Sequence, residues 1–176
     1  VHPNSGWLPM PKQVNGFSQV HVSGTGGGPK YGNILVMPFG KGMDQLNHID
    51  YRKDETIRLG YYATEFQRTG IYTEITTAPR ASFYRFTYPE DSLKSLLVDA
   101  GFFLGEQPTP DAREAQQFVG SEIQIISDHE VMGYTRIRGG WNNGRAYTVY
   151  FYAVTDHPVV QTATWKGSQI SNERYQ

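Results

Sequence analysis

The chain has 176 residues, with 16 Lys and Arg against 17 Asp and Glu, so its formal net charge is only −1. A balance so close to neutral gives no electrostatic reason to expect nucleic acid or a membrane surface as a partner. The absence of cysteine excludes disulfides and thiol catalysis. No apolar stretch approaches the length needed to cross a bilayer. We therefore expect no membrane insertion, and a single domain with one sizeable core.

Alternating or β-branched runs predict strands almost throughout the chain. In chain order they cover residues 14–22, 34–39, 59–67, 71–78, 82–88, 94–103, 122–127, 131–138, 145–155 and 159–165. Turn-forming residues separate these runs, as in Arg68-Thr69-Gly70. One segment differs, because Thr109 to Gln117 is rich in helix formers and Asp111 is placed to cap a short helix. The pattern predicts an all-β fold, an antiparallel β-sandwich with one short helix.

A glycine-rich run, Gly16 to Gly28, carries one histidine and two hydroxyls near its centre. A dinucleotide-binding fingerprint would need a sixth-position glycine where this chain has Pro29. A phosphate-binding P-loop would need Gly-Lys-Ser/Thr where it has Pro29-Lys30-Tyr31. Two interpretations remain open, a site for a polar ligand and a structural β-connection that needs positive φ angles.

Residues suited to catalysis do not gather in the sequence. The five histidines, His2, His21, His48, His129 and His157, have no metal-ligand spacing, so we expect no metal site in this chain. Asp128 and Glu130 would lie roughly 6.6 Å apart on one strand face, near the separation used by inverting glycosidases. Their segment reads better as a hairpin turn. We therefore expect no catalytic residue in this chain.

Aromatic residues divide into expected core and candidate surface. We expect Phe17, Phe83, Phe86, Tyr150 and Tyr152 to be core or half-buried, since buried rings supply much of a sandwich's stability. Trp7 lies in an irregular segment before the glycine-rich run, where its indole face is suited to stacking on a sugar ring or to plain packing.

The run Gly16-Phe17-Ser18-Gln19-Val20-His21-Val22-Ser23-Gly24-Thr25-Gly26 resembles the signature Gly-Phe-Ser-His-Thr-His-Leu-Ser-Gly-Thr-Gly of glycoside hydrolase family 92. That signature lies in the N-terminal domain of these calcium-dependent exo-acting α-mannosidases. Further motifs resemble that domain in the same order: Gly60-Tyr61-Tyr62, Thr77-Ala78-Pro79-Arg80 with Phe83-Tyr84-Arg85-Phe86, Gly139-Gly140-Trp141, and Tyr147-Thr148-Val149-Tyr150-Phe151. The resemblance runs from about Trp7 to about Trp165. Gln19 departs from it by replacing the first histidine, so linkage or substrate preference does not carry over.

The resemblance implies a supersandwich-like N-terminal domain of a bacterial enzyme that hydrolyses terminal α-mannosides with inversion. The implied partners are a helical catalytic domain of the same polypeptide, which this chain lacks, and a mannose-containing glycan. Calcium would bind mostly outside this chain. The implied localisation is secreted, periplasmic or cell-surface.

The residues expected at the sugar pocket or at the domain interface are Trp7, His21, Ser23, Gly24, Thr25 and Gly26. His21 would hydrogen-bond a sugar hydroxyl and transfer no proton. Two other functions stay open. A free-standing carbohydrate-binding module would show an open aromatic platform, and a purely structural docking domain would have no affinity for sugar.

Overall fold

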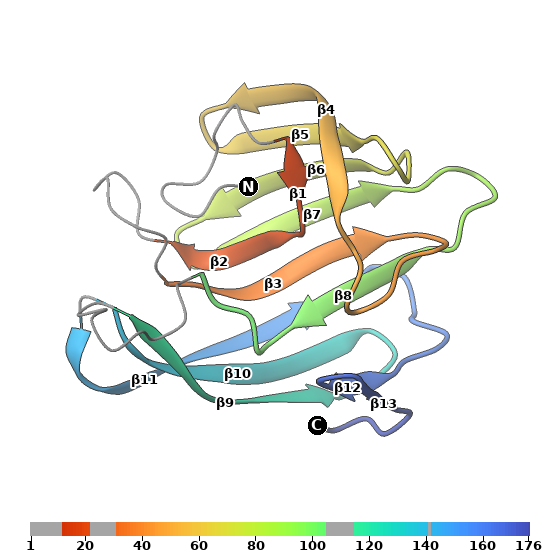
Figure 1. Cartoon of the computed structure of the whole chain (residues 1–176). Coiled ribbons are helices and arrows are strands. Elements are labelled where there is room, and N and C mark those ends of the chain that lie inside the picture. The colour runs from red at the N-terminus through yellow and green to blue at the C-terminus, as the bar shows by residue number, and fades with distance from the viewer. Residues whose placement is uncertain (1–11, 22–30, 105–114, 141) are drawn as a thin grey trace. The chain divides into compact units, whose positions relative to one another are not determined.

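A computed structural model describes residues 12–21, 31–104, 115–140 and 142–176 of the chain (Figure 1). The described strands, in chain order, are β1 (Gln13–Val14), β2 (Phe17–His21), β3 (Tyr31–Phe39), β4 (Asp50–Arg58), β5 (Tyr61–Phe66), β6 (Tyr72–Ala78), β7 (Ala81–Thr87), β8 (Ser95–Asp99), β9 (Gln116–Ile125), β10 (Glu130–Gly139), β11 (Asn142–Val154), β12 (Thr164–Lys166) and β13 (Gln169–Ser171). Within these ranges the chain forms no helix, and the strand pairs whose registers are known are antiparallel. The predicted all-β fold is confirmed, and the several antiparallel sheets fit a β-sandwich.

The predicted short helix does not extend to its expected end. Residues 109–114 lie outside the described part of the chain. Gln116 and Gln117 begin β9, where they pair with Gly139 and Arg138 of β10. The helix prediction is wrong at these two residues, because pairing with a neighbouring strand overrides their local preference for helix.

The chain divides into two compact units. Among the described residues, the first unit comprises 12–17 and 36–97, and the second comprises 18–21, 31–35, 98–104, 115–140 and 142–176. Strands β2, β3 and β8 each belong in part to both units, and they form a sheet in the order β2-β3-β8.

The first unit is built on a five-stranded sheet in the order β1-β4-β5-β6-β7 (Figure 1). Phe17 lies at the centre of its aromatic core, with ring centroids 6.2 Å from Phe66, 6.1 Å from Tyr62 and 6.4 Å from Tyr84. Strand β7 shows how the sequence produces this face, because its burial alternates and places Tyr84 and Phe86 on the covered side.

Strand β4 forms although its sequence, DYRKDETIR, has no apolar alternation. Its inward positions are polar and paired. The fully buried carboxylate of Asp50 accepts hydrogen bonds from the backbone amides of Arg68 and Thr69 and from the Thr69 hydroxyl. Arg52, 3% exposed, donates from Nη1 to Glu55 Oε1 at 2.7 Å. The strand is therefore held by satisfied polar groups, which periodicity does not detect.

The second unit contains the sheet β11-β10-β9 and the small pair β12-β13. Ile137 and Thr135 of β10 are fully buried on one face of the three-stranded sheet. The other face carries the cross-strand pairs Met132–Tyr152 and Tyr134–Tyr150. The rings of Tyr134 and Tyr150 lie 5.8 Å apart.

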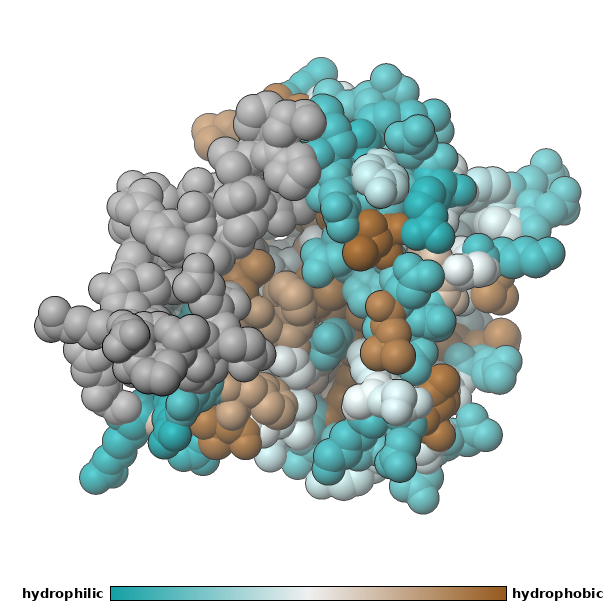
Figure 2. Space-filling model, in the orientation of Figure 1, coloured by the Kyte–Doolittle hydropathy of each residue, from teal (hydrophilic) through white to brown (hydrophobic). Residues whose placement is uncertain are grey.

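The expected burial of aromatic residues holds only in part. Phe17 is buried and Phe86 is half-buried, as predicted. The prediction is wrong for Phe83, Tyr150 and Tyr152, which are 65%, 77% and 59% exposed. Alternation along a strand separates two faces but does not say which one is covered. In the view of Figure 2, hydrophobic residues reach the surface at several separate places among hydrophilic ones.

Candidate functional site

The residues predicted to bind sugar or the catalytic domain lie almost entirely outside the described part of the chain. Trp7, Ser23, Gly24, Thr25 and Gly26 are not described. His21 ends β2, and only its backbone is described. Their place at the sugar pocket or at the domain interface therefore stays a prediction. Gln19, which departs from the signature, lies in β2 and is half-buried.

The strands before and after residues 22–30, which we call the glycine-rich segment, depart from ordinary β geometry. Val20 in β2 and Tyr31 and Ile34 in β3 have φ angles of 55°, 67° and 58°. For a β-branched residue this left-handed conformation is an outlier that costs about 1–3 kcal/mol, so the surrounding contacts must enforce it. Gly32, at φ 62°, lies so close to Leu104 that an added Cβ would be 2.4 Å from its Cδ1. The backbone here is closely constrained.

A buried polar cluster fixes the start of β3. Gln116 is 1% exposed, and its Oε1 accepts a hydrogen bond from the backbone amide of Tyr31 at 2.7 Å. The Tyr147 hydroxyl lies 3.4 Å from Gln116 Nε2 and 3.4 Å from Asn33 Oδ1. Burial raises the pKa of Tyr147, so this phenol stays neutral at physiological pH. We name these four residues, Tyr31, Asn33, Gln116 and Tyr147, the β3 anchor.

One atom of the β3 anchor lacks a partner. Asn33 is fully buried, and in the part of the chain that the structure describes its Nδ2 makes no hydrogen bond. The anchor contains no acid and base pair, so its chemistry is that of positioning. The glycine-rich segment ends directly before Tyr31, and the anchor therefore holds the point at which that segment re-enters the sheet.

Asp128 lies in the turn between β9 and β10, as predicted, whereas Glu130 is already the first residue of β10 and pairs with Val154 of β11. Glu130 accepts hydrogen bonds from the Tyr152 hydroxyl and, at 3.0 Å, from Ser127 Oγ. These two bonds, that from Tyr152 first, lower the pKa of Glu130. The Asp128 carbonyl accepts a bond from the Val159 amide at 2.6 Å. The Glu130 side chain thus has a structural role, and the contact described for Asp128 is made by its backbone. Among the described residues there is no group of three or more side chains able to hold a metal ion.

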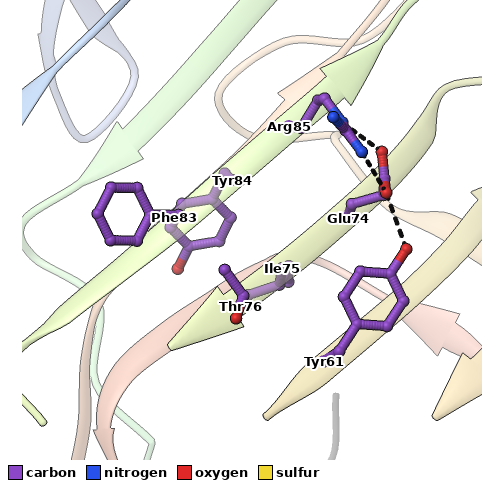
Figure 3. A pocket seen from close by; sticks show the side chains of 7 residues that line it. All are labelled: Tyr61, Glu74, Ile75, Thr76, Phe83, Tyr84 and Arg85. Carbon is purple, nitrogen blue, oxygen red and sulfur yellow. Dashed lines mark hydrogen bonds and ion pairs between the residues drawn. The ribbon is translucent and has the colours of Figure 1, made fainter. Parts of the chain in front are cut away.

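A shallow pocket of about 250 Å³ lies on the first unit, lined by residues of β5, β6 and β7 (Figure 3). Its lining comprises Tyr61, Glu74, Ile75, Thr76, Phe83, Tyr84 and Arg85. The side chains of Tyr61, Glu74 and Arg85 point toward one another from three adjacent strands (Figure 3). Glu74 Oε1 accepts hydrogen bonds from the Tyr61 hydroxyl at 2.8 Å and from Arg85 Nη2 at 2.7 Å, and its Oε2 accepts from Arg85 Nε at 2.5 Å.

These contacts shift the acid–base behaviour of the pocket. The hydrogen bond from Arg85, followed by that from Tyr61, lowers the pKa of Glu74 from 4.5 to about 2. The bond to Glu74, followed by burial, raises the pKa of Tyr61 from 10.0 to about 12. Glu74, the partner of Arg85, stands directly opposite it on the neighbouring strand.

The pair predicts a pH dependence of stability. A lowered carboxylate pKa stabilises the fold above pH 4.5, and this contribution is lost as the pH falls toward about 2. A raised phenol pKa stabilises below pH 10, and that contribution is lost as the pH rises toward about 12. Glu74→Gln should make the free energy of unfolding, measured with urea, depend less on pH both below pH 4.5 and above pH 10. The difference should be clearest at low salt. Glu65→Gln is the control. If the free energy of unfolding changed equally with pH in the two variants, the assignment of this pH dependence to Glu74 would be contradicted.

Comparison with known proteins places this geometry in context. The model of the glycosyl hydrolase family 92 N-terminal domain matches residues 2–176. An uncharacterized secreted glycosidase from Arthroderma benhamiae is 33% identical over 92 residues, which make up 47% of this chain and 12% of that protein.

Solved structures resemble the chain over nearly all of its length. A family 92 α-mannosidase from Bacteroides thetaiotaomicron, in complex with mannoimidazole, matches with a TM-score of 0.74 and 25% identity, over 97% of this chain and 23% of that one. The structure of that enzyme described without mannoimidazole matches with the same TM-score and identity, over 24% of its length. A family 92 glycosyl hydrolase called ccman5 shares the fold, with a TM-score of 0.74 and 21% identity, over all of this chain and 24% of that one. The chain thus spans about a quarter of the length of these structures.

In the described part of the chain, the structure contains no helix that is long and apolar enough to cross a membrane.

Proposed function

Because the chain belongs to glycosyl hydrolase family 92, as its N-terminal domain, we propose that it is part of an enzyme that hydrolyses terminal α-mannosides with inversion. Its similarity to a secreted glycosidase and to a bacterial α-mannosidase supports this substrate class and secretion. Since the chain spans about a quarter of the matched structures, the proposal places the acid and base in a further, helical domain of the same polypeptide.

The proposed role of this chain is to supply one wall of the sugar pocket through its glycine-rich segment. The observation that carries this role is the β3 anchor. Its buried hydrogen bond from the Tyr31 amide to Gln116 fixes the backbone where the segment ends, and Val20 is held in a left-handed conformation just before the segment begins. The backbone on each side of residues 22–30 is therefore held in one conformation.

Within this wall, we assign hydrogen bonding of the sugar to His21, Ser23 and Thr25, and ring stacking to Trp7. Gly24 and Gly26 would let the backbone approach the ligand or the catalytic domain closely. Calcium has no role in this assignment. The described residues include no cluster of three or more side chains that fits the ion, and the proposal places its ligands mostly in the rest of the enzyme.

Activity measurements test the proposal. The isolated 176-residue chain should not hydrolyse aryl α-mannosides with or without calcium, whereas the longer polypeptide that contains it should. In that longer enzyme, His21→Ala should lower kcat/KM up to about tenfold, because a hydrogen bond to a neutral hydroxyl contributes about 0.5–1.5 kcal/mol. Its melting temperature should stay unchanged.

Two results would contradict this assignment. Turnover by the isolated chain that is abolished by changing Asp128 or Glu130 would place catalysis in the β9–β10 turn. A large fall in melting temperature for His21→Ala, with unchanged kinetics, would make the histidine structural. Gln19→His serves as the companion variant, since a changed preference among α-mannosides would connect this position to specificity.

A further inference from the structure

We propose that the pocket on β5, β6 and β7 binds one sugar ring of a glycan, at a site whose described lining comes from these three strands. The proposal goes beyond hydrolysis and does not depend on it. The pocket residues come from two motifs of the sequence, Gly60-Tyr61-Tyr62 and Phe83-Tyr84-Arg85-Phe86, together with β6 between them.

The strand register places the polar and aromatic groups on one face. Tyr61 pairs with Thr76, and Thr76 pairs with Phe83, so these three residues form one row across the sheet. Glu74 and Arg85 pair in the next row. Since residues two apart on a strand share a face, both rows project to the same side. This face carries the exposed ring of Phe83 at one side and the linked side chains of Tyr61, Glu74 and Arg85 at the other (Figure 3).

The charges in the pocket favour a neutral ligand. The Glu74 carboxylate accepts both described hydrogen bonds of the Arg85 guanidinium, and its pKa is low enough to keep it ionised at neutral pH. The two charges therefore offset each other, which leaves little attraction for a free anion or cation. A phosphate or a carboxylate would have to compete with Glu74 for Arg85.

The remaining hydrogen-bonding capacity suits hydroxyl groups. A guanidinium has five N–H donors, and Glu74 engages only Nε and Nη2 of Arg85, so the Nη1 hydrogens face no described partner. Thr76 donates its hydroxyl hydrogen to the Gly60 carbonyl at 2.8 Å, which leaves the Thr76 oxygen as an acceptor. The site thus presents donors and an acceptor together.

The apolar part of the site is an aromatic ring. Phe83 is 65% exposed, although burying a phenyl group would be favourable. A pyranose offers a C–H face for such a ring and hydroxyls around its edge for Arg85 and Thr76. The volume of about 250 Å³ is below the range of about 300–1,000 Å³ typical of drug-sized ligands. The pocket therefore fits one ring of a glycan at a time.

The test is a titration of the 176-residue chain with methyl α-mannopyranoside and methyl α-glucopyranoside, followed by amide NMR shifts. We expect shifts at residues 60–62, 74–76 and 83–85 that saturate with at least one of the two sugars. Phe83→Ala should weaken this binding about three- to tenfold, with an unchanged melting temperature, because the ring is exposed. Tyr150→Ala is the matched control, since that ring is 77% exposed in another sheet, and its binding should change less than twofold.

Several outcomes would overturn the proposal. These are saturation by neither sugar, shifts confined to other residues, or equal weakening by Phe83→Ala and Tyr150→Ala. Stronger shifts of the same amides with inorganic phosphate would mean that the site binds an anion instead. Equal shifts with glycerol would mean that it does not recognise a ring. The proposed hydrolysis is measured separately, on the longer polypeptide. If that polypeptide were inactive but this pocket still bound sugar, only the proposed function would be contradicted.

Discussion

Glu55→Ala should destabilise the chain by about 3–5 kcal/mol, the usual cost of removing one partner from a buried ion pair. Glu55 is nearly buried, with its side chain 7% exposed, and Oε1 accepts from Arg52 Nη1 and from the Tyr62 hydroxyl, each at 2.7 Å. The Arg52 side chain is 1% exposed, so the substitution leaves a shielded guanidinium without this carboxylate. For a chain of this length, the melting temperature should fall by about 6–20 °C.

The control for this prediction is Glu65→Ala. Glu65 forms an ion pair of the same 2.7 Å length with Lys53 on the neighbouring strand, but its side chain is 36% exposed and that of Lys53 is 44% exposed. Exposed ion pairs contribute little, so thermal melts should hardly change. Glu55→Gln should fall between the two, because the amide oxygen still accepts a hydrogen bond. Equal melting temperatures for Glu55→Ala and Glu65→Ala would show that burial of the Arg52 pair contributes nothing.

The same ion pair shows why one strand was missing from the sequence-based prediction. Periodicity detects strands whose covered face is apolar, such as β7 with Tyr84 and Phe86. In β4 the inward positions are Asp50 and Arg52, whose burial depends on partners distant in sequence. Conversely, residues 159–163 include three β-branched side chains but form no strand, and Val160 is 98% exposed. Local β propensity alone therefore predicts neither the strand at residues 50–58 nor the lack of one at residues 159–163.

The candidate site was predictable only as a segment. The glycines, hydroxyls and histidine around Gly24 are visible in the sequence, and family resemblance gives them a role. Their support is not visible, because Gln116 lies 85 residues from Tyr31, and Tyr147 lies 114 residues from Asn33. A buried glutamine at the start of a strand has no sequence signal. The Tyr147 motif was the one available indication.

The pocket on the first unit was hidden for a different reason. Tyr61, Phe83 and Arg85 were recognised as parts of family motifs, but Phe83 was expected to be core. Only the register, which sets Glu74 opposite Arg85 and Thr76 opposite Phe83, reveals that these residues share an exposed face. A shift of one residue would have moved the whole set to the covered side.

Gly133→Ala should destabilise the second unit by about 2–3 kcal/mol, at the upper end of the usual cost of overpacking. Gly133 lies in the middle of β10, opposite Ile123 of β9 and Phe151 of β11. A Cβ added there would lie 2.1 Å from the Glu122 carbonyl oxygen and 2.8 Å from Phe151 Cε1. The carbonyl belongs to the neighbouring strand and cannot rotate away as a side chain can. Strand β9 would have to move.

Gly120→Ala, in the same sheet, should change the stability in the opposite direction. No atom lies within 4 Å of an added Cβ at Gly120, and its φ angle is not in the left-handed region. The substitution removes backbone freedom from the unfolded chain and should stabilise by about 0.4–1 kcal/mol. This entropic gain also applies at Gly133, but it is smaller than the cost of the clash. Urea unfolding of the two variants should therefore bracket the wild type, with Gly133→Ala below it and Gly120→Ala at or above it. If Gly133→Ala were as stable as Gly120→Ala, β9 and β10 would be able to separate without loss of stability. The packing that holds Gln116 at the start of β9 could then not be rigid enough to anchor β3.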